Sequence, residues 1–112
     1  MAMVKAKLIK RYDVYLVNLE PTVGYEIKKS RPCVIVSPDE MNVLKTVIIA
    51  PMTTVIRDFP FRVHIYFEEK EGQVALDQIR CVDKIRLIKK LGVIDNHPAN
   101  EISRVLIQMF SQ

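Results

Sequence analysis

The order of the elements along the chain constrains its fold more than any other feature: short strand-like runs come first and one helix-like stretch comes last. Residues 61–67 alternate, with Phe61, Val63, Ile65 and Phe67 on one face. This alternation is typical of a strand that buries one face. Other apolar or β-branched runs, ended by proline or charged residues, predict strands at 12–19, 33–37, 46–49 and 73–82.

The C-terminal stretch has a different period. Its apolar residues recur at intervals of three and four, which predicts one stripe along a helix that serves as core or dimer interface. They are Ile102, Val105, Leu106, Met109 and Phe110. Asp95 or Asn96 is expected to cap this helix, and Pro98 suits its first turn.

Strands therefore precede a single helix without strand–helix alternation. Residues 84–91 between them are mixed and are predicted to form a short helical turn followed by a brief strand. We expect a mainly β (α+β) protein: a strongly curved antiparallel sheet or small barrel with the helix packed against it. A chain of 112 residues has room for one such domain.

The cysteine and histidine content bears on the compartment and on metal binding. Cys33 and Cys81 lie far apart and form no C-x-x-C pair, so we expect reduced, buried thiols in a cytoplasmic protein. His64 and His97 are the only histidines, which makes a zinc site improbable. No apolar run is long enough to span a membrane, and the N-terminus lacks the apolar core of a secretory signal.

Charge is distributed unevenly along the chain. The net charge is +4, and the four cations within the first eleven residues account for all of it. Beyond them, basic residues gather at 28–31 and 80–90, whereas acids gather apart from them at 68–71. Such segregation favours a polyanionic partner, although charged loops of this kind are also common as solvated surface.

Three polar features stand out against the apolar runs. Arg31 precedes Pro32 at the start of a predicted strand, where the backbone is restricted. Thr53 and Thr54 follow a buried strand, so two hydroxyl groups emerge at its end. Polar residues at 77, 78 and 80 interrupt an apolar segment and need either a structural network or a pocket.

Five stretches resemble the MazF/PemK family of toxin endoribonucleases. They are RYDVYLVNLEPTVGYEIKKSRPCVIVS from residue 11, MN at 41–42, IIAPMTT at 48–54, VALDQIRCVDKIRL at 74–87, and the closing helix. The resemblance covers roughly residues 11–110, so we predict a family domain at 11–112. Residues 1–10 are expected to be an arm, an added edge strand or an extension introduced by cloning.

This resemblance implies a homodimer of curved β domains of the CcdB/PemK/MazF type, with an SH3-like barrel and a C-terminal helix. It implies cleavage of single-stranded RNA, such as messenger RNA, without a metal or cofactor, often at a short preferred sequence. It also implies an antitoxin partner, MazE- or PemI-like, with an acidic and apolar-studded tail that occupies the substrate groove. A histidine used by some PemK-type members has no counterpart here, which leaves the acid–base assignment open.

The resemblance also implies the catalytic residues. Arg31 matches the arginine of a K-x-R-P motif, Thr53 the threonine of P-x-T, and Glu26 the glutamate of G-x-E. Arginine grips phosphate oxygens in a fork, a threonine hydroxyl adds a hydrogen bond, and a glutamate beside lysines can accept a proton. The remaining residues expected to bind substrate are Tyr25, which can stack on a base, and Lys28, Thr54, Asp77, Gln78, Arg80 and Arg86.

Two other functions remain open on sequence grounds. A CcdB-like inhibitor of DNA gyrase would have the same fold, but the gyrase contact of that family uses a tryptophan near the C-terminus, and this chain has no tryptophan. A barrel that binds RNA without cleaving it is the other alternative.

Overall fold

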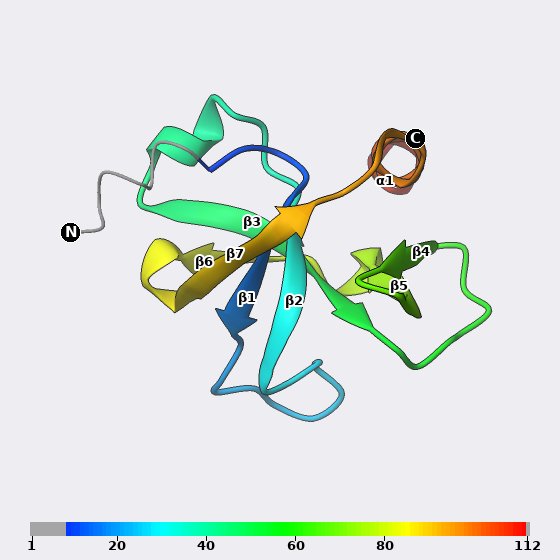
Figure 1. The fold of residues 1–112 in the computed structure, drawn as a ribbon, viewed down its shortest axis with the longest axis horizontal. Helices are drawn as coiled ribbons and strands as arrows, with labels where there is room; N and C mark the ends of the chain where they lie inside the picture. Colours follow the sequence, from blue (N-terminus) through cyan, green and yellow to red (C-terminus); the bar gives the residue numbers. More distant parts are fainter. Residues whose placement is uncertain (1–8, 112) are drawn as a thin grey trace.

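The computed structural model describes residues 9–111 and has seven strands followed by a C-terminal helix (Figure 1). The strands are β1 (Asp13–Asn18), β2 (Ser30–Ile35), β3 (Thr46–Thr53), β4 (Arg62–Phe67), β5 (Lys70–Ala75), β6 (Arg80–Asp83) and β7 (Leu87–Val93). The helix is α1 (Asn96–Phe110), and short 3₁₀ turns lie at η2 (Met41–Val43), η3 (Leu76–Gln78) and η4 (Lys84–Arg86). The turn and strand expected within 84–91 are thereby confirmed. Most of the predicted N-terminal arm, residues 1–8, lies outside the described residues.

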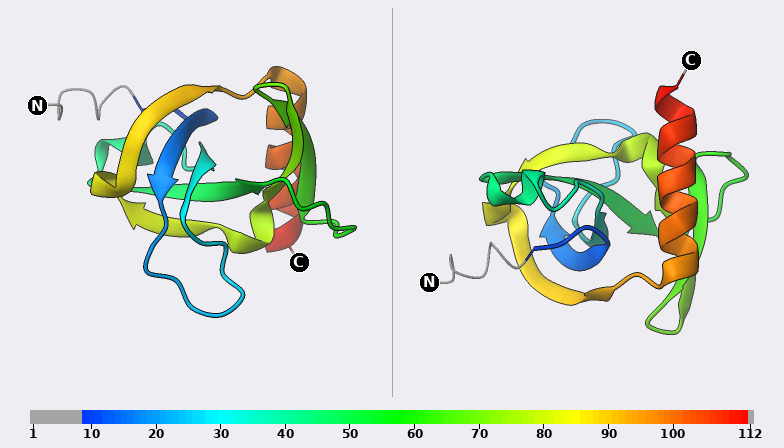
Figure 2. Two further views of the ribbon diagram at one scale, coloured as in Figure 1. Left: turned by 60° about the horizontal axis from the view of Figure 1, so that its bottom comes forward. Right: turned by 90° about the horizontal axis from the view of Figure 1, so that it is seen from above.

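The strands pair antiparallel in the order β4-β5-β3-β2-β1-β7, and β6 pairs with β3 as well. β3 therefore lies in the middle, with β2 along one side and β5 and β6 in succession along the other. The sheet curls strongly, and α1 lies beside β4 and η3 (Figure 2). The predicted fold class, a curved antiparallel sheet with a C-terminal helix, is confirmed.

The single strand predicted over 73–82 is wrong in its middle. β5 pairs Val74 with Met52, and β6 pairs Arg80 with Ile49, so residues 75–79 stand opposite only Ala50 and Pro51. Pro51 has no backbone N–H to donate to a neighbouring strand, and the ladder is interrupted beside it. The intervening residues coil into η3, which turns polar side chains outward at this point.

The β4–β5 hairpin keeps the alternation expected from the sequence. Val63 and Ile65 are buried, whereas His64 and Tyr66 are exposed. Phe61, expected on the buried face, lies before the strand begins and is 41% exposed. The turn consists of the two residues between Phe67 and Lys70, which are Glu68 and Glu69.

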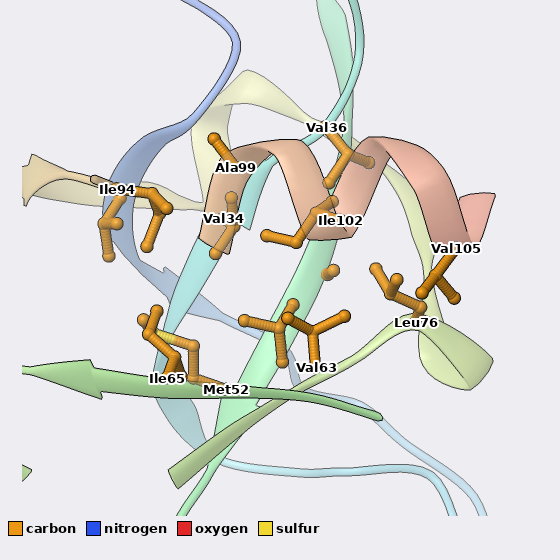
Figure 3. Packing of buried hydrophobic residues seen from close by; sticks show 13 residues of the cluster. Val34, Val36, Met52, Val63, Ile65, Leu76, Ile94, Ala99, Ile102 and Val105 are labelled. Carbon is orange, nitrogen blue, oxygen red and sulfur yellow. The ribbon is translucent and has the colours of Figure 1, made fainter. Parts of the chain in front are cut away.

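Two clusters of buried side chains stabilise the two faces of the sheet. The cluster beneath α1 includes Val34, Met52, Val63, Leu76 and Ile102 (Figure 3). The cluster on the opposite face includes Ile9, Val17, Leu19, Cys33, Ile35, Val47, Ile49 and Val82. The helix thus covers one face of β2 and β3 and leaves the end of the other face free for a site.

The helix begins where the sequence indicates, with Asp95 at the N-cap position, although the Asp95 side chain makes no capping hydrogen bond. Ile102 and Val105 are buried as predicted, but Phe110 at the end of the stripe is 72% exposed. No helix within residues 9–111 is long and apolar enough to cross a membrane.

Both cysteines are free thiols, and only one of them is buried. Cys33 lies in the cluster away from α1, as predicted. The prediction that Cys81 is buried is wrong, because Cys81 lies on the outward face of the short strand β6 while its neighbour Val82 points into the core.

Candidate active site

The end of β3 and the beginning of β2 meet at a cavity of about 210 Å³. Arg31 and Thr53 line it together with Thr54. The observed pairing of Cys33 with Pro51, continued by two residues, sets Arg31 across from Thr53. Because side chains alternate along strands, both share the face of Cys33, which is turned away from α1.

The Arg31 side chain is half-buried and held from one side only. Its Nε–H donates to the carbonyl of Lys28 at 2.8 Å, and its terminal nitrogens make no hydrogen bond to the residues that the structure describes. The guanidinium plane is therefore oriented by the protein while the donors that form a fork stay available. Such a fork matches two oxygens of a phosphate group.

Thr53 is only 8% exposed, so its hydroxyl group has a restricted environment. The Oγ1 atom accepts a hydrogen bond from the Val55 N–H at 3.1 Å. The hydroxyl proton has no acceptor among residues 9–111, which leaves it free to be donated to a bound anion.

The acids at 68–71 do not lie apart from the basic loops, and that prediction is wrong. Glu68 and Glu71 line the same cavity as Arg31, because the pairing of β5 with the end of β3 carries the hairpin turn to it. The Glu71 Oε2 lies 2.6 Å from the His64 Nε2 on the exposed face of the hairpin. The rim of the cavity thus carries both signs of charge.

A second cavity, of about 620 Å³, lies next along β3. Pro51 lines it, and Pro51 and Thr53 share one face of the strand about 7 Å apart. Among the residues expected to bind or act on substrate, it is lined by Tyr25, Glu26, Asp77, Gln78 and Arg80. The structure therefore divides the candidate residues between two adjoining cavities, with Glu26 in the one that lacks Arg31.

Glu26 and Tyr25 occupy the loop between β1 and β2. The Glu26 Oε1 accepts a hydrogen bond from the Val23 N–H at 2.8 Å, which closes the tip of the loop on itself. Gly24 at this tip has a φ of +59°, a conformation that glycine adopts without strain. The ring of Tyr25 is fully exposed.

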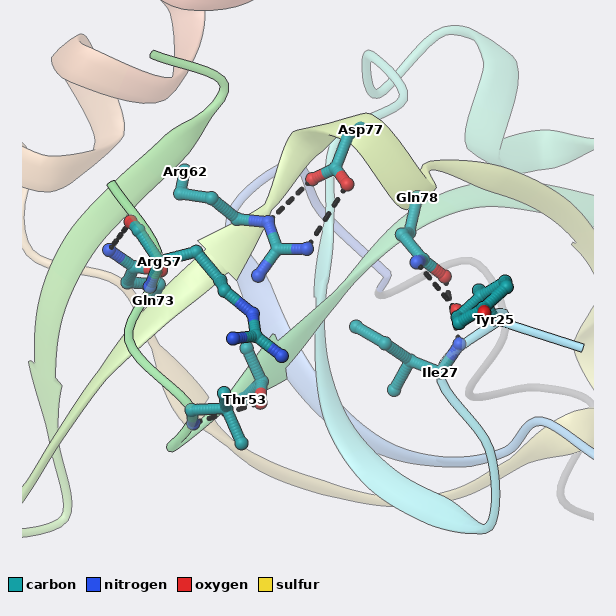
Figure 4. Close-up of polar contacts among 9 residues, drawn as sticks. Tyr25, Ile27, Thr53, Arg57, Arg62, Gln73, Asp77 and Gln78 are labelled. Atoms are coloured by element: carbon teal, nitrogen blue, oxygen red, sulfur yellow. Dashed lines mark hydrogen bonds and ion pairs between the residues drawn. The ribbon is translucent and has the colours of Figure 1, made fainter. Parts of the chain in front are cut away.

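Gln78 joins this loop to the body of the protein. Its Oε1 accepts from the Ile27 N–H at 2.8 Å, and its Nε2 donates to the Tyr25 carbonyl at 3.1 Å (Figure 4). The neighbouring Asp77 forms two bonds with the guanidinium of Arg62, at 2.6 and 3.1 Å. Both residues predicted to bind substrate are thus already engaged within the protein.

The two arginines on the β6 side hold the start of the same loop. Arg80 donates to the Leu19 carbonyl at 3.1 Å. Arg86 donates to the Asn18 carbonyl at 3.1 Å and also to the carbonyl of Glu20. The Glu20 carboxylate in turn accepts from the Lys29 N–H at 2.8 Å, and this hydrogen bond lowers its pKa. Lys28, by contrast, is exposed.

Comparison with known proteins agrees with this architecture. A family model, described as the PemK-like, MazF-like toxin of type II toxin–antitoxin systems, matches residues 10–110. The chain belongs to this family. Endoribonuclease EndoA of Bacillus subtilis (strain 168) is 31% identical to the toxin over 106 residues, which cover 88% of this chain and 91% of the relative.

Solved structures have the same fold as this toxin. MazF of Deinococcus radiodurans superposes with a TM-score of 0.81 at 21% identity, over 93% of this chain and 97% of that one. An endoribonuclease from mycobacterial species, solved in complex with its cognate antitoxin, gives a TM-score of 0.76 at 25% identity, over 89% of this chain and 92% of that one.

Some residues that shape the site of the toxin were not singled out from the sequence. Gln73, 6% exposed, accepts from the Arg57 N–H at 3.0 Å and donates to the Arg57 carbonyl at 2.9 Å, which fixes the loop after β3. The sequence did carry a signal for Gln73, because a polar residue at the start of the strand predicted over 73–82 needs a hydrogen-bond partner. Arg62 and Glu20 gave no such signal, because their partners are set by the tertiary fold.

Proposed function

We propose that the toxin is an endoribonuclease that cleaves single-stranded RNA, messenger RNA in particular, and thereby inhibits translation and growth. The family assignment and the name of the Bacillus relative support the reaction. One observation supports the location: Arg31, Thr53 and Thr54 line a single cavity.

RNA supplies its own nucleophile, so the protein needs neither a covalent residue nor a metal-bound water. The 2′-oxygen attacks the adjacent phosphorus and loses its proton, the bond from phosphorus to the 5′-oxygen breaks, and solvent water supplies the proton that the 5′-oxygen takes. Arg31 and the Thr53 hydroxyl donate to the phosphate oxygens, whose negative charge grows as the phosphorane forms. A preorganised arginine fork stabilises that charge at little reorganisation cost.

Glu26 is our proposed acceptor of the 2′-proton. Its Oε1 is bonded to the loop tip, which leaves the second carboxylate oxygen for the proton. The substrate in this proposal lies along the end of β3 across both cavities, with a base stacked on Tyr25. Lys28 and Thr54 add charge and a hydroxyl group beside the strand, and Asp77, Gln78, Arg80 and Arg86 shape the second cavity and its loop.

The decisive experiment incubates purified protein with single-stranded RNA in the presence of EDTA and maps the cut sites and the termini. We expect cleavage to persist, and Arg31→Ala to lower kcat by about 10²–10³. Arg31→Lys keeps the charge but loses the fork, so it should recover only part of the rate. Arg104→Ala, on the exposed side of α1, is the matched control. Intact RNA with the wild type, or undiminished cutting by Arg31→Ala, would refute the proposal.

We also propose that the toxin is a cytoplasmic homodimer whose partner is an antitoxin with an acidic tail. The mycobacterial relative was solved with its antitoxin, which supports a partner of this kind. Ile107 and Phe110 on α1 are 70% and 72% exposed and offer apolar surface for a second copy. Sedimentation is expected to give twice the 13.0 kDa of one chain.

A further inference from the structure

We propose that Gln78 is a positioning residue that holds the β1–β2 loop in its substrate-binding shape and thereby sets affinity and sequence preference for RNA. This inference rests on the proposed function. The observation behind it is that a single side-chain amide pairs with two backbone groups of a loop that is distant in the sequence (Figure 4).

Gln78 supplies all the hydrogen bonds by which residues 21–28 reach the rest of the described chain beyond 20–31. The other bonds of this segment stay within the loop or its base: Val23 with Glu26, Thr22 with Glu20, and the Lys28 carbonyl with Arg31. Losing the amide would therefore leave the loop tip attached only by its own ends and by the packing of Ile27.

The side-chain amide of Gln78 takes the place of a neighbouring strand, because it offers the loop backbone one acceptor and one donor, as a strand would. The amide oxygen takes the Ile27 N–H, and the amide nitrogen gives a proton to the Tyr25 carbonyl. The loop segment Tyr25–Ile27, with Glu26 at its centre, is thus fixed at both ends. Both the stacking ring and the proposed proton acceptor lie within the fixed segment.

The position of Gln78 is itself fixed by contacts of its neighbours in η3. The preceding residue, Asp77, forms a two-point ion pair with Arg62 at the start of β4, and the Arg62 guanidinium lies 5.5 Å from the centre of the Phe59 ring. The 3₁₀ turn η3 that carries both residues packs on the core through Leu76, which is fully buried. The rigid body of the sheet therefore fixes the position of the amide, and the amide fixes the loop.

A loop held before the substrate arrives loses less conformational entropy on binding, and a displaced one misaligns the reacting groups. The Gln78→Leu variant keeps the size of the side chain but removes both hydrogen bonds. We expect it to raise KM about tenfold and also to lower kcat, because the loop carries both Tyr25 and the proposed proton acceptor Glu26. We also expect a lower ratio of kcat/KM between an oligonucleotide with the wild-type cut site and its single-base variants.

The test combines kinetics with amide hydrogen exchange measured on the full-length protein without RNA. In Gln78→Leu, exchange at the Ile27 N–H should accelerate at least tenfold, while exchange at the Leu76 N–H, bonded to the Phe61 carbonyl, stays unchanged. Gln78→Glu keeps the acceptor for Ile27 and loses the donor to Tyr25, so it should lie between the two. Lys45→Leu, on the exposed segment between η2 and β3, is the control and should match the wild type.

The outcomes separate this inference from the proposed function. Unchanged Ile27 exchange in Gln78→Leu, or faster exchange with unchanged KM and base selectivity, overturns the positioning role. If the wild type leaves RNA intact, the proposed function fails, and the exchange measurement alone then decides whether Gln78 holds the loop. If Gln78→Leu fails to fold by circular dichroism, Gln78→Glu carries the same comparison.

Discussion

At the scale of single residues, the environment of a side chain decides what its chemical group can do. Thr53 and Thr54 are adjacent in the sequence, yet Thr53 is buried with its oxygen bonded to the Val55 N–H, and Thr54 is exposed. Only the Thr53 hydroxyl is therefore held in a fixed orientation toward the cavity. A fixed donor stabilises developing charge better than a mobile one, because no reorganisation is needed.

Thr53→Val, which has nearly the same shape but lacks the hydroxyl group, should lower kcat for RNA cleavage by about 10². Thr53→Ser should retain most of the rate. Thr46→Val, at the opposite end of the same strand, controls for the change in polarity. Steady-state kinetics on one oligonucleotide measures all three, and a Thr53→Val enzyme as fast as the wild type would contradict the role of this hydroxyl.

Cys33 provides a pH-dependent prediction at the same scale. Burial raises the pKa of the Cys33 thiol to about 12 from an ordinary 9.0, an effect that Arg80 and Arg31 only partly oppose. Above pH 9 the unfolded thiol loses a proton that the folded one keeps, so the free energy of unfolding falls as pH rises. We expect wild type to lose about 1 kcal/mol more than Cys33→Ala between pH 8 and pH 10 in urea unfolding.

A background of Cys81→Ser isolates the buried thiol in this comparison. Lysine and tyrosine titration affects both proteins alike and cancels in the difference. Equal losses of stability in the two proteins would show that Cys33 ionises as readily when folded as when unfolded. Alkylation with iodoacetamide at pH 8 provides an independent check, because exposed Cys81 should react in the folded wild type and Cys33 should not.

At the scale of elements, the interruption between β5 and β6 and the hairpin between β4 and β5 together shape the site. The interruption frees η3 to carry Gln78 toward the loop, and the hairpin turn lies at the Arg31 cavity. The turn is strained, because Glu68 and Glu69 have φ values of 50° and 65°. Side chains with a Cβ adopt such angles at a cost, whereas Asn-Gly suits a two-residue hairpin turn.

The double substitution Glu68→Asn with Glu69→Gly should therefore stabilise the protein by about 1 kcal/mol. Chemical denaturation at pH 7 provides the measurement. The pair Glu68→Gln with Glu69→Gln removes the same two charges without relieving the backbone, so it should stay close to the wild type. If the glutamine pair stabilises as much as the Asn-Gly pair, repulsion between charges rather than backbone strain is the cause.

At the scale of the whole molecule, α1 covers one face of the sheet, and the two cavities lie side by side at the end of β3. The basic residues do not all contribute to an exposed positive surface. Arg80 and Arg86 are engaged by backbone carbonyls, whereas Lys28 and Lys29 remain exposed on the loop. Arg80 and Arg86 keep their charge, but their bonded donors are less available to a partner, so direct contact with an anionic partner falls mainly to the loop lysines near the site.

Replacing Lys28 and Lys29 by alanine should slow association with an acidic antitoxin tail, and the slowing should be greater at low salt. Stopped-flow association at two ionic strengths measures both effects. Lys45→Ala, on the exposed segment between η2 and β3, is the matched control and should leave the rate unchanged. An unchanged rate in the double variant would show that the antitoxin docks elsewhere.

Local sequence patterns determined the strands, the terminal helix and the family to which the chain belongs. Alternation and three-to-four spacing depend on which face of an element is buried, and motif residues such as Arg31 and Thr53 are read directly from the chain. The interruption of the strand predicted over 73–82 could not be predicted from local patterns. Its break depends on its position beside Pro51 of another strand.

The tertiary structure alone decided which side chains meet. The β2–β3 register sets Arg31 across from Thr53, the hairpin brings Glu68 and Glu71 to the same cavity, and Gln78 bonds to a residue 51 positions away. Local backbone preferences extend over a few residues, so they specify elements. Pairing between distant segments depends instead on the packing of two buried clusters, whose members come from most of the strands and from α1.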